Sequence, residues 1–245
     1  PGFAVTDDLA ARLIFDETWE EWLAGQMTPE NTVLRRAVEL GIRCEPGAGL
    51  YSLARTLDDH RDLLDRVKPD EPCDDKALAQ TAQVICDLAR EIESTLPHCS
   101  DRSDNGAQQI EHAIAPLAAS DPPDDFDSAI AWVQTLPELN ARSGTQKNWD
   151  TAVLAAAKER TAELKAHIEW FRGEVNHRVL HDVARYMGGF LEALRQARIR
   201  QRALDFHDLL LLSRNMLRDS PAARAHFKRA WRYILVDEFQ DTDPL

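Results

Sequence analysis

The longest stretch without a strong interruption of helical periodicity runs from roughly residue 150 to 202. It contains no proline, and its main breakers are Gly173 and the pair Gly188–Gly189. Because proline and glycine are the residues that most weaken a helix, their scarcity here predicts one long helical region. Helical signals dominate the rest of the chain as well, so we expect a mainly α fold.

Four more helices are predicted before this region from their apolar spacing and their end signals. Thr28 followed by Pro29 is typical of a helix start, and Asp7 or Asp8 caps the first helix. Loops rich in Pro, Asp and Ser are predicted over 68–75, 97–106 and 120–127. The predicted helices cover 8–25, 29–41, 50–67 and 75–96.

Two short helices are predicted after the long one. Asp205 is the expected N-cap of the first, with Asp208 near the positive end of its dipole. Ser220 followed by Pro221 starts the second.

The character of the sequence then changes at residues 233–236, which read YILV. A continuous apolar run of β-favouring residues suits a strand buried on both faces of a parallel sheet. A lone parallel strand cannot stand by itself, so its partners are expected outside this chain. Ligands of such sheets bind beyond the carboxyl ends of the strands, where Asp237 and Glu238 would lie.

An Asp–Glu pair after an apolar run is common, because that is where a strand meets water. The full string ILVDEFQDTDPL is more specific, and it resembles motif II of the UvrD/Rep-type superfamily-one DNA helicases, in their RecB/AddA-like branch. ALDFHDLLLLSRNML is similar to the segment before motif II in that family. PGFAVTDDLAARLIFDETWEEWL is similar to the start of the family's helical insertion, and GTQKNW fits its middle.

The resemblance implies a helical subdomain of the 1B type over 1–204 and part of a RecA-like, P-loop NTPase motor domain over 205–245. It implies a motor driven by ATP and Mg²⁺ that moves along single-stranded DNA, normally three-prime to five-prime, and separates the duplex in repair or recombination. Nuclease or helicase subunits are further expected partners. Carried over, Asp237 is the magnesium-associated acid, Glu238 the catalytic base and Gln240 a phosphate-coupled residue, with Asp241 and Thr242 fastening the loop.

The sequence departs from the family pattern in three places. His207 stands where an acid is frequent in the family's LDFDDL string, and the basic run ARIRQRA replaces a glycine often found before it. No G-x-x-x-x-G-K-[ST] phosphate loop occurs in these residues, so nothing here can cradle the phosphates of ATP. The parent protein is expected to hydrolyse ATP, whereas this chain alone is expected to be inactive.

The net charge is −13, but it is unevenly distributed. Residues 195–232 carry ten Lys/Arg against three acids, which gives +7, whereas residues 1–194 carry −16. Arg195, Arg198 and Arg202 recur at spacings of three and four, so we expect them to share one helix face that contacts DNA phosphates. The alternative is a solvated helical face.

The four cysteines, Cys44, Cys73, Cys86 and Cys99, are widely spaced and contain no C-x-x-C pair. This spacing favours reduced thiols in a cytoplasmic protein over a metal site. No apolar run is long enough to cross a bilayer, and the N-terminus lacks the pattern of a signal peptide. A chain that begins at Pro1 and ends just past a motif is expected to be a piece of a longer protein.

Two other interpretations remain open. The acidic, helix-rich chain would also suit a protein-interaction module whose terminal acids are only a surface loop. The other is a helicase-derived subunit that has lost its motor and holds DNA. The order DEFQDT after an apolar run distinguishes the first of these from a helicase, since an interaction module has no need of it.

Overall fold

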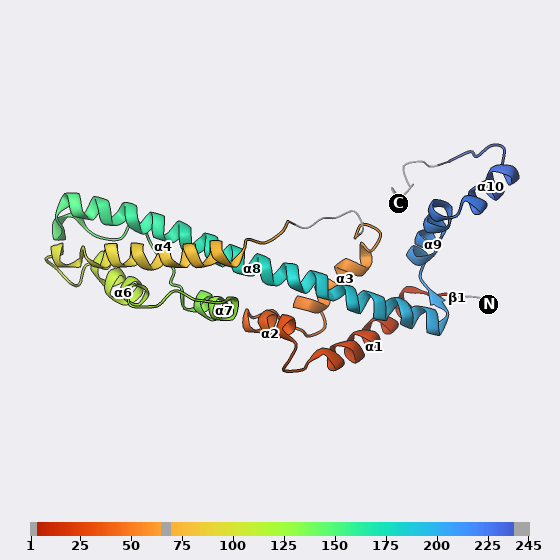
Figure 1. The fold of residues 1–245 in the computed structure, drawn as a ribbon, viewed down its shortest axis with the longest axis horizontal. Coiled ribbons are helices and arrows are strands. Elements are labelled where there is room, and N and C mark those ends of the chain that lie inside the picture. Colours follow the sequence, from red (N-terminus) through yellow and green to blue (C-terminus); the bar gives the residue numbers. More distant parts are fainter. Residues whose placement is uncertain (1–3, 65–69, 238–245) are drawn as a thin grey trace. The chain divides into compact units, whose positions relative to one another are not determined.

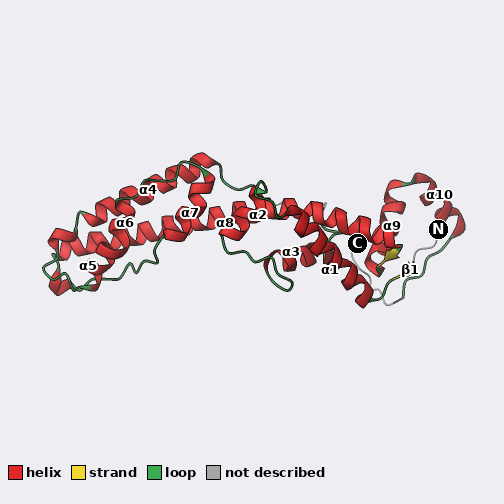
Figure 2. Cartoon of the chain, turned by 90° about the horizontal axis from the view of Figure 1, so that it is seen from below, coloured by secondary structure: helices red, strands yellow, loops and turns green. Residues whose placement is uncertain are grey.

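The structure, a computed structural model, describes residues 4–64 and 70–237. Helices dominate it (Figure 2), which confirms the mainly α prediction. The longer helices are α1 (Asp8–Gln26), α2 (Thr32–Glu39), α3 (Gly49–Asp59), α4 (Asp75–Glu93), α7 (Phe126–Thr135), α8 (Thr151–Gln201), α9 (Phe206–Asp219) and α10 (Pro221–Ala230). Shorter elements are β1 (Ala4–Val5), η1 (Leu96–His98), α5 (Asn105–Gln109), η2 (Ile110–Ile114), α6 (Ala115–Ala118), η3 (Gln146–Asn148) and β2 (Ala203–Leu204).

The chain divides into two compact units, and α8 contributes to both. Unit 1 combines Pro1–Asn31, Cys44–Lys68 and Tyr186–Leu245. Unit 2 combines Thr32–Arg43 and Pro69–Arg185. Each unit is therefore assembled from segments far apart in the sequence.

Unit 1 is built around an aromatic core between α1, α3 and the C-terminal part of α8. Phe15 and Trp19 lie one turn apart on α1, as an amphipathic helix requires, and both are buried. Their rings meet the ring of Phe190 edge-on, with centroids 5.1 and 5.2 Å away. Tyr51 from α3 adds a third edge-on contact, 5.4 Å from Phe15. Such edge-to-face packing suits the quadrupoles of aromatic rings and orients the three helices.

A short parallel pairing joins the two ends of the helical stretch in unit 1. β1 pairs with β2, with Ala4 opposite Ala203 and Val5 opposite Leu204. Thr6 N donates a further hydrogen bond to Leu204 O at 3.0 Å. No sheet was expected here from the sequence, because two residues per strand are too few to show periodicity.

In unit 2, α4 runs antiparallel to the first part of α8 (Figure 1). Glu91 near the end of α4 pairs with Arg160 near the start of α8 at 3.3 Å, whereas Asp75 at the start of α4 pairs with Arg178 further along. α4 also packs against η2 and α6. The buried core of this unit includes Ile85, Ile92, Ile114, Ile130, Leu164, Ile168 and Phe171.

Most of the predicted helices are confirmed. Asp7 caps α1 by accepting from Ala10 N at 2.8 Å, and α8 continues through Gly173 and Gly188–Gly189. α10 begins as predicted, with Ser220 accepting from Ala223 N at 3.2 Å.

Two predicted helix boundaries are wrong. The helix expected from Pro29 begins only at Thr32, and Asn31 just before it donates through Nδ2 to Gln26 O at 2.9 Å and to the Tyr186 hydroxyl at 2.6 Å. The helix expected over 50–67 ends at Asp59. The helices between residues 105 and 135 were not predicted.

Candidate functional site: motif II and a buried ion-pair cluster

Motif II lies at the C-terminal end of the described residues. Asp237 is exposed, whereas Glu238, Gln240, Asp241 and Thr242 lie outside the described residues. The strand predicted over 233–236 is not confirmed, since these residues are neither helical nor paired in a sheet. Their side chains are exposed, with Leu235 at 96%.

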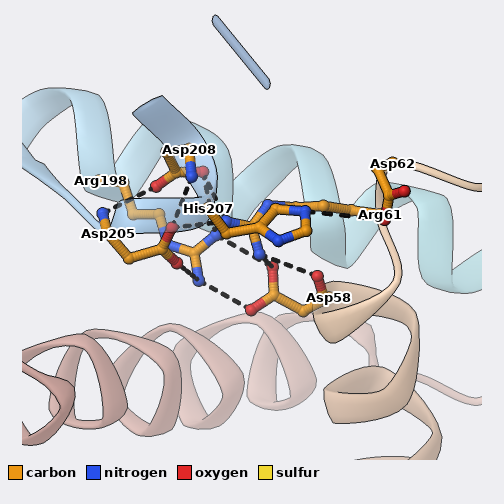
Figure 3. Close-up of polar contacts among 7 residues, drawn as sticks. All are labelled: Asp58, Arg61, Asp62, Arg198, Asp205, His207 and Asp208. Atoms are coloured by element: carbon orange, nitrogen blue, oxygen red, sulfur yellow. Dashed lines mark hydrogen bonds and ion pairs between the residues drawn. The ribbon is translucent and has the colours of Figure 1, made fainter. Parts of the chain in front are cut away.

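A group of charged side chains in unit 1 lies where α9 begins (Figure 3). The sequence places Asp58, Arg61 and Asp62 at the end of α3, Arg198 near the end of α8, and Asp205, His207 and Asp208 at the start of α9. These seven residues are called the ion-pair cluster below.

Arg198 is the buried centre of the ion-pair cluster. It is only 6% exposed, and its two terminal nitrogens donate to the two carboxylate oxygens of Asp58 at 2.9 and 2.7 Å. Its Nη2 also lies 3.4 Å from Asp205 Oδ2, and its Nη1 lies 3.7 Å from Asp208 Oδ1. The planar guanidinium suits this two-pronged pairing, which an ammonium group could not reproduce.

Arg61 bridges the end of α3 to α9. Its Nη1 donates to the backbone oxygen of Asp58 at 2.8 Å, which also accepts from Arg61 N at 3.3 Å. Its Nη2 donates to Asp205 Oδ1 at 2.7 Å and to Asp208 Oδ1 at 2.9 Å. The same side chain thus links the turn after α3 to the start of α9.

The two aspartates also form a capping box at the start of α9. Asp208 N donates to Asp205 Oδ1 at 2.6 Å, and Asp205 N donates to Asp208 Oδ2 at 3.1 Å. This confirms the predicted N-cap. Each carboxylate therefore serves the α9 backbone and the arginines at once.

The electrostatics of the ion-pair cluster favour the charged forms of Arg198 and Asp205. Burial alone would lower the pKa of Arg198, but the hydrogen bond and charge of Asp58, followed by the charges of Asp208 and Asp205, raise it. Burial alone would raise the pKa of Asp205, yet the backbone N–H of Asp208 and the charges of Arg61 and Arg198 lower it. These opposed effects are what a buried, hydrogen-bonded charge group shows.

His207 occupies the outer side of the ion-pair cluster. Its Nε2 is buried, has no hydrogen-bond partner among the described residues, and lies 3.6 Å from Asp62 Oδ1. Besides His207, the cluster contains two guanidinium groups and four carboxylates (Figure 3). An aspartate at position 207 would therefore add a fifth acid.

Comparison with known proteins identifies the family of this chain. Residues 58–245 match the UvrD/REP helicase N-terminal domain. The chain belongs to the UvrD/REP helicase family. This confirms the resemblance inferred from motif II.

The chain is also similar to the RecBCD enzyme subunit RecB of Mycobacterium tuberculosis, in strains CDC 1551 / Oshkosh and ATCC 25618 / H37Rv. It is 46% identical to each of them over 63 residues. That segment is 25% of this chain, and it spans only 6% of the length of these relatives.

The three arginines predicted to share one DNA-contacting face have different surroundings in the structure. Arg198 is buried among carboxylates, and Arg202 lies beyond the end of α8 with a left-handed φ of 54°. Arg195 is exposed and pairs with Glu192 at 2.8 Å. The prediction of a shared exposed helix face is therefore wrong for Arg198. Its simple helical spacing could not show that acids from α3 and α9 would surround it.

In unit 2, the GTQKNW string surrounds one buried carboxylate. Asp104 Oδ1 accepts from Trp149 Nε1 at 3.0 Å and from Gly106 N at 2.8 Å, whereas Oδ2 accepts from Thr145 N at 2.9 Å and Asn148 Nδ2 at 3.1 Å. Burial alone would raise the pKa of Asp104, but these four donors hold it well below its usual range. The string therefore joins two loops of unit 2, and Trp149 is buried between them.

Within residues 4–64 and 70–237, no group of three His, Cys, Asp or Glu side chains could hold a metal ion, and all four cysteines are free thiols. The same residues contain no helix that is long and apolar enough to span a membrane.

Proposed function

We propose that this chain is the part of an ATP-dependent DNA helicase or translocase that carries a helical 1B subdomain and motif II. The single observation behind the proposal is the match of residues 58–245 to the UvrD/REP helicase N-terminal domain, which includes the DEFQDT string. The parent protein would move three-prime to five-prime in DNA repair or recombination, in the cytoplasm.

In this proposal residues 1–204 are the 1B subdomain and residues 205–245 begin the motor domain. The β1–β2 pairing supports an insertion, because it brings together the two ends of the helical stretch. The exposed apolar run 233–236 also supports the proposal, since four adjacent apolar side chains in water suit a strand that pairs with other segments of the protein.

Asp237 fits the part of a magnesium-associated acid. Its carboxylate is exposed on the residue that directly follows the apolar run, and carboxylate oxygens are ligands that Mg²⁺ prefers. When bound, Mg²⁺ would neutralise charge that develops on the phosphates of ATP. Glu238 would accept a proton from the attacking water, Gln240 would contact the terminal phosphate, and Asp241 and Thr242 would hold the loop.

DNA and other subunits are the proposed partners. Arg195 and Arg202 are exposed at the end of α8 and would contact DNA phosphates. Arg198 is left out, because its guanidinium is buried. The relatives are named as a subunit of an enzyme, which supports nuclease or helicase partner subunits for this protein as well.

A second candidate is a DNA-holding or interaction module without motor activity. The observation in its favour is the acidic, helix-rich character of residues 1–194, which carry a net charge of −16. This candidate predicts DNA binding that is independent of ATP and of Glu238.

The test is DNA-stimulated ATP hydrolysis by the complete gene product, with and without Glu238→Gln. The helicase proposal expects hydrolysis that rises with single-stranded DNA and falls about 100-fold or more in the variant, as loss of a general base predicts. The isolated 245-residue chain should hydrolyse no ATP. A complete gene product that binds DNA without hydrolysing ATP would favour the second candidate.

A further inference from the structure

α9 has little apolar packing within the described part of the chain. None of its 14 residues, all of them described, is buried. A groove of about 480 Å³ lies between its apolar side and α8, with Leu191 and Ile199 on one wall and Leu211 and Leu212 on the other. Apolar contacts with α8 therefore contribute little to fixing the direction of α9 within unit 1.

The N-terminus of α9 is held tightly instead. Its first turn is fastened through Asp205 and Asp208, which accept from Arg61 at 2.7 and 2.9 Å and lie within 3.7 Å of Arg198. Replacing buried ion pairs by apolar residues often leaves stability unchanged or raises it, so stability alone does not explain such a group. The charged groups fix the direction of α9, since each guanidinium can pair with carboxylates in only a narrow range of positions.

The path from α9 to motif II is short. Ser220 alone separates α9 from α10, and Arg224 Nη1 of α10 donates back to Leu217 O of α9 at 2.7 Å. Asp237 follows α10 by seven residues. A rotation of α9 about its first turn would therefore move the start of motif II.

We propose that Arg198 and Arg61 are positioning residues for motif II: they fix α9 by its N-terminal carboxylates, and α9 with α10 carries Asp237. The inference rests on the proposed function. In this proposal the two arginines act through the direction of α9.

The test compares variants of the complete gene product. Arg198→Met/Asp58→Ala removes the central pair without leaving either charge alone, and Arg198→Lys keeps the charge but loses the two-pronged geometry. Arg160→Met is the matched control, because Arg160 is an ion-paired but exposed arginine of the same helix. Thermal unfolding, amide hydrogen exchange and ATP hydrolysis are measured for each.

In the double variant, exchange of the α9 amides should rise at least about tenfold, while exchange in α4 stays unchanged. The kcat for ATP should fall about 100-fold, as small misplacements of a catalytic group can cause, with KM changed by less than about twofold. Arg198→Lys should lie between the wild type and the double variant. The control should match the wild type in all three measurements.

Unchanged α9 exchange in both cluster variants would overturn the inference. So would faster α9 exchange with a normal kcat, because α9 would then not direct motif II. A wild-type protein that hydrolyses no ATP would instead refute the proposed function, and the exchange measurement would still decide whether the arginines hold α9.

Discussion

Arg198 and Asp58 face each other in a buried two-pronged ion pair, although 140 residues separate them in the sequence. The pair ties the end of α8 to the end of α3. Asp205 and Asp208 then join it from α9.

Arg198→Ala should lower the free energy of unfolding by about 3–5 kcal/mol, because it leaves Asp58 buried without its main partner. Urea denaturation followed by circular dichroism measures the change. Arg195→Ala is the control, since Arg195 pairs with Glu192 in an exposed position and should contribute less than about 1 kcal/mol. Equal losses of unfolding free energy in the two variants would show that burial does not set how much each arginine contributes to stability.

Stability should fall in acid because of Asp104 and Asp205, whose pKa values are lowered in the folded protein. A carboxyl with a lowered pKa stabilises the fold above its unfolded pKa, near 4, and loses that contribution as the pH falls towards the folded value. The free energy of unfolding should therefore decrease below about pH 5. Denaturation in urea at a series of pH values measures it.

Asp104→Asn is the variant that isolates the first of these carboxyls. It places an amide NH₂ against two of the four donors, so it should cost about 2–4 kcal/mol at neutral pH. Its stability should also depend less on pH in the acid range than that of the wild type. If the free energy of unfolding depended on acid pH as it does in the wild type, Asp104 would not be a source of that dependence.

His207→Asp should destabilise unit 1 by about 1–3 kcal/mol at neutral pH, because it adds a carboxylate beside Asp62 to a cluster with excess acid. The loss should shrink as the pH falls towards the pKa of the new carboxyl. His207→Asn is the neutral control and should cost less. A stabilising effect of His207→Asp would mean that the cluster tolerates a fifth acid.

Gly173→Ala should raise the free energy of unfolding by about 0.5–1 kcal/mol, because alanine is the better helix former. An added Cβ at Gly173 meets nothing within 4 Å. Gly144→Ala is the opposite case, since Gly144 has φ +101° and its Cβ would lie 2.7 Å from Leu154 Cδ1. The temperature of thermal unfolding should therefore rise for the first variant and fall for the second.

The helical character, the long α8 and the caps at Asp7, Asp205 and Ser220 could be predicted from the sequence, because they depend on residues within a few positions of one another. The family could be recognised for a similar reason. Its motif II is a short continuous string, and the match over residues 58–245 confirms it.

The tertiary structure alone decided what Arg198 contacts and which distant residues meet Asn31 and Arg61. Asn31 is recruited by Tyr186, and Arg61 by Asp205 and Asp208, across more than 140 residues. Helical spacing places Arg195, Arg198 and Arg202 close together, but it carries no information on which of them is surrounded by other segments. Burial, which turns an arginine from a surface cation into the centre of an ion-pair cluster, is a property of the folded chain.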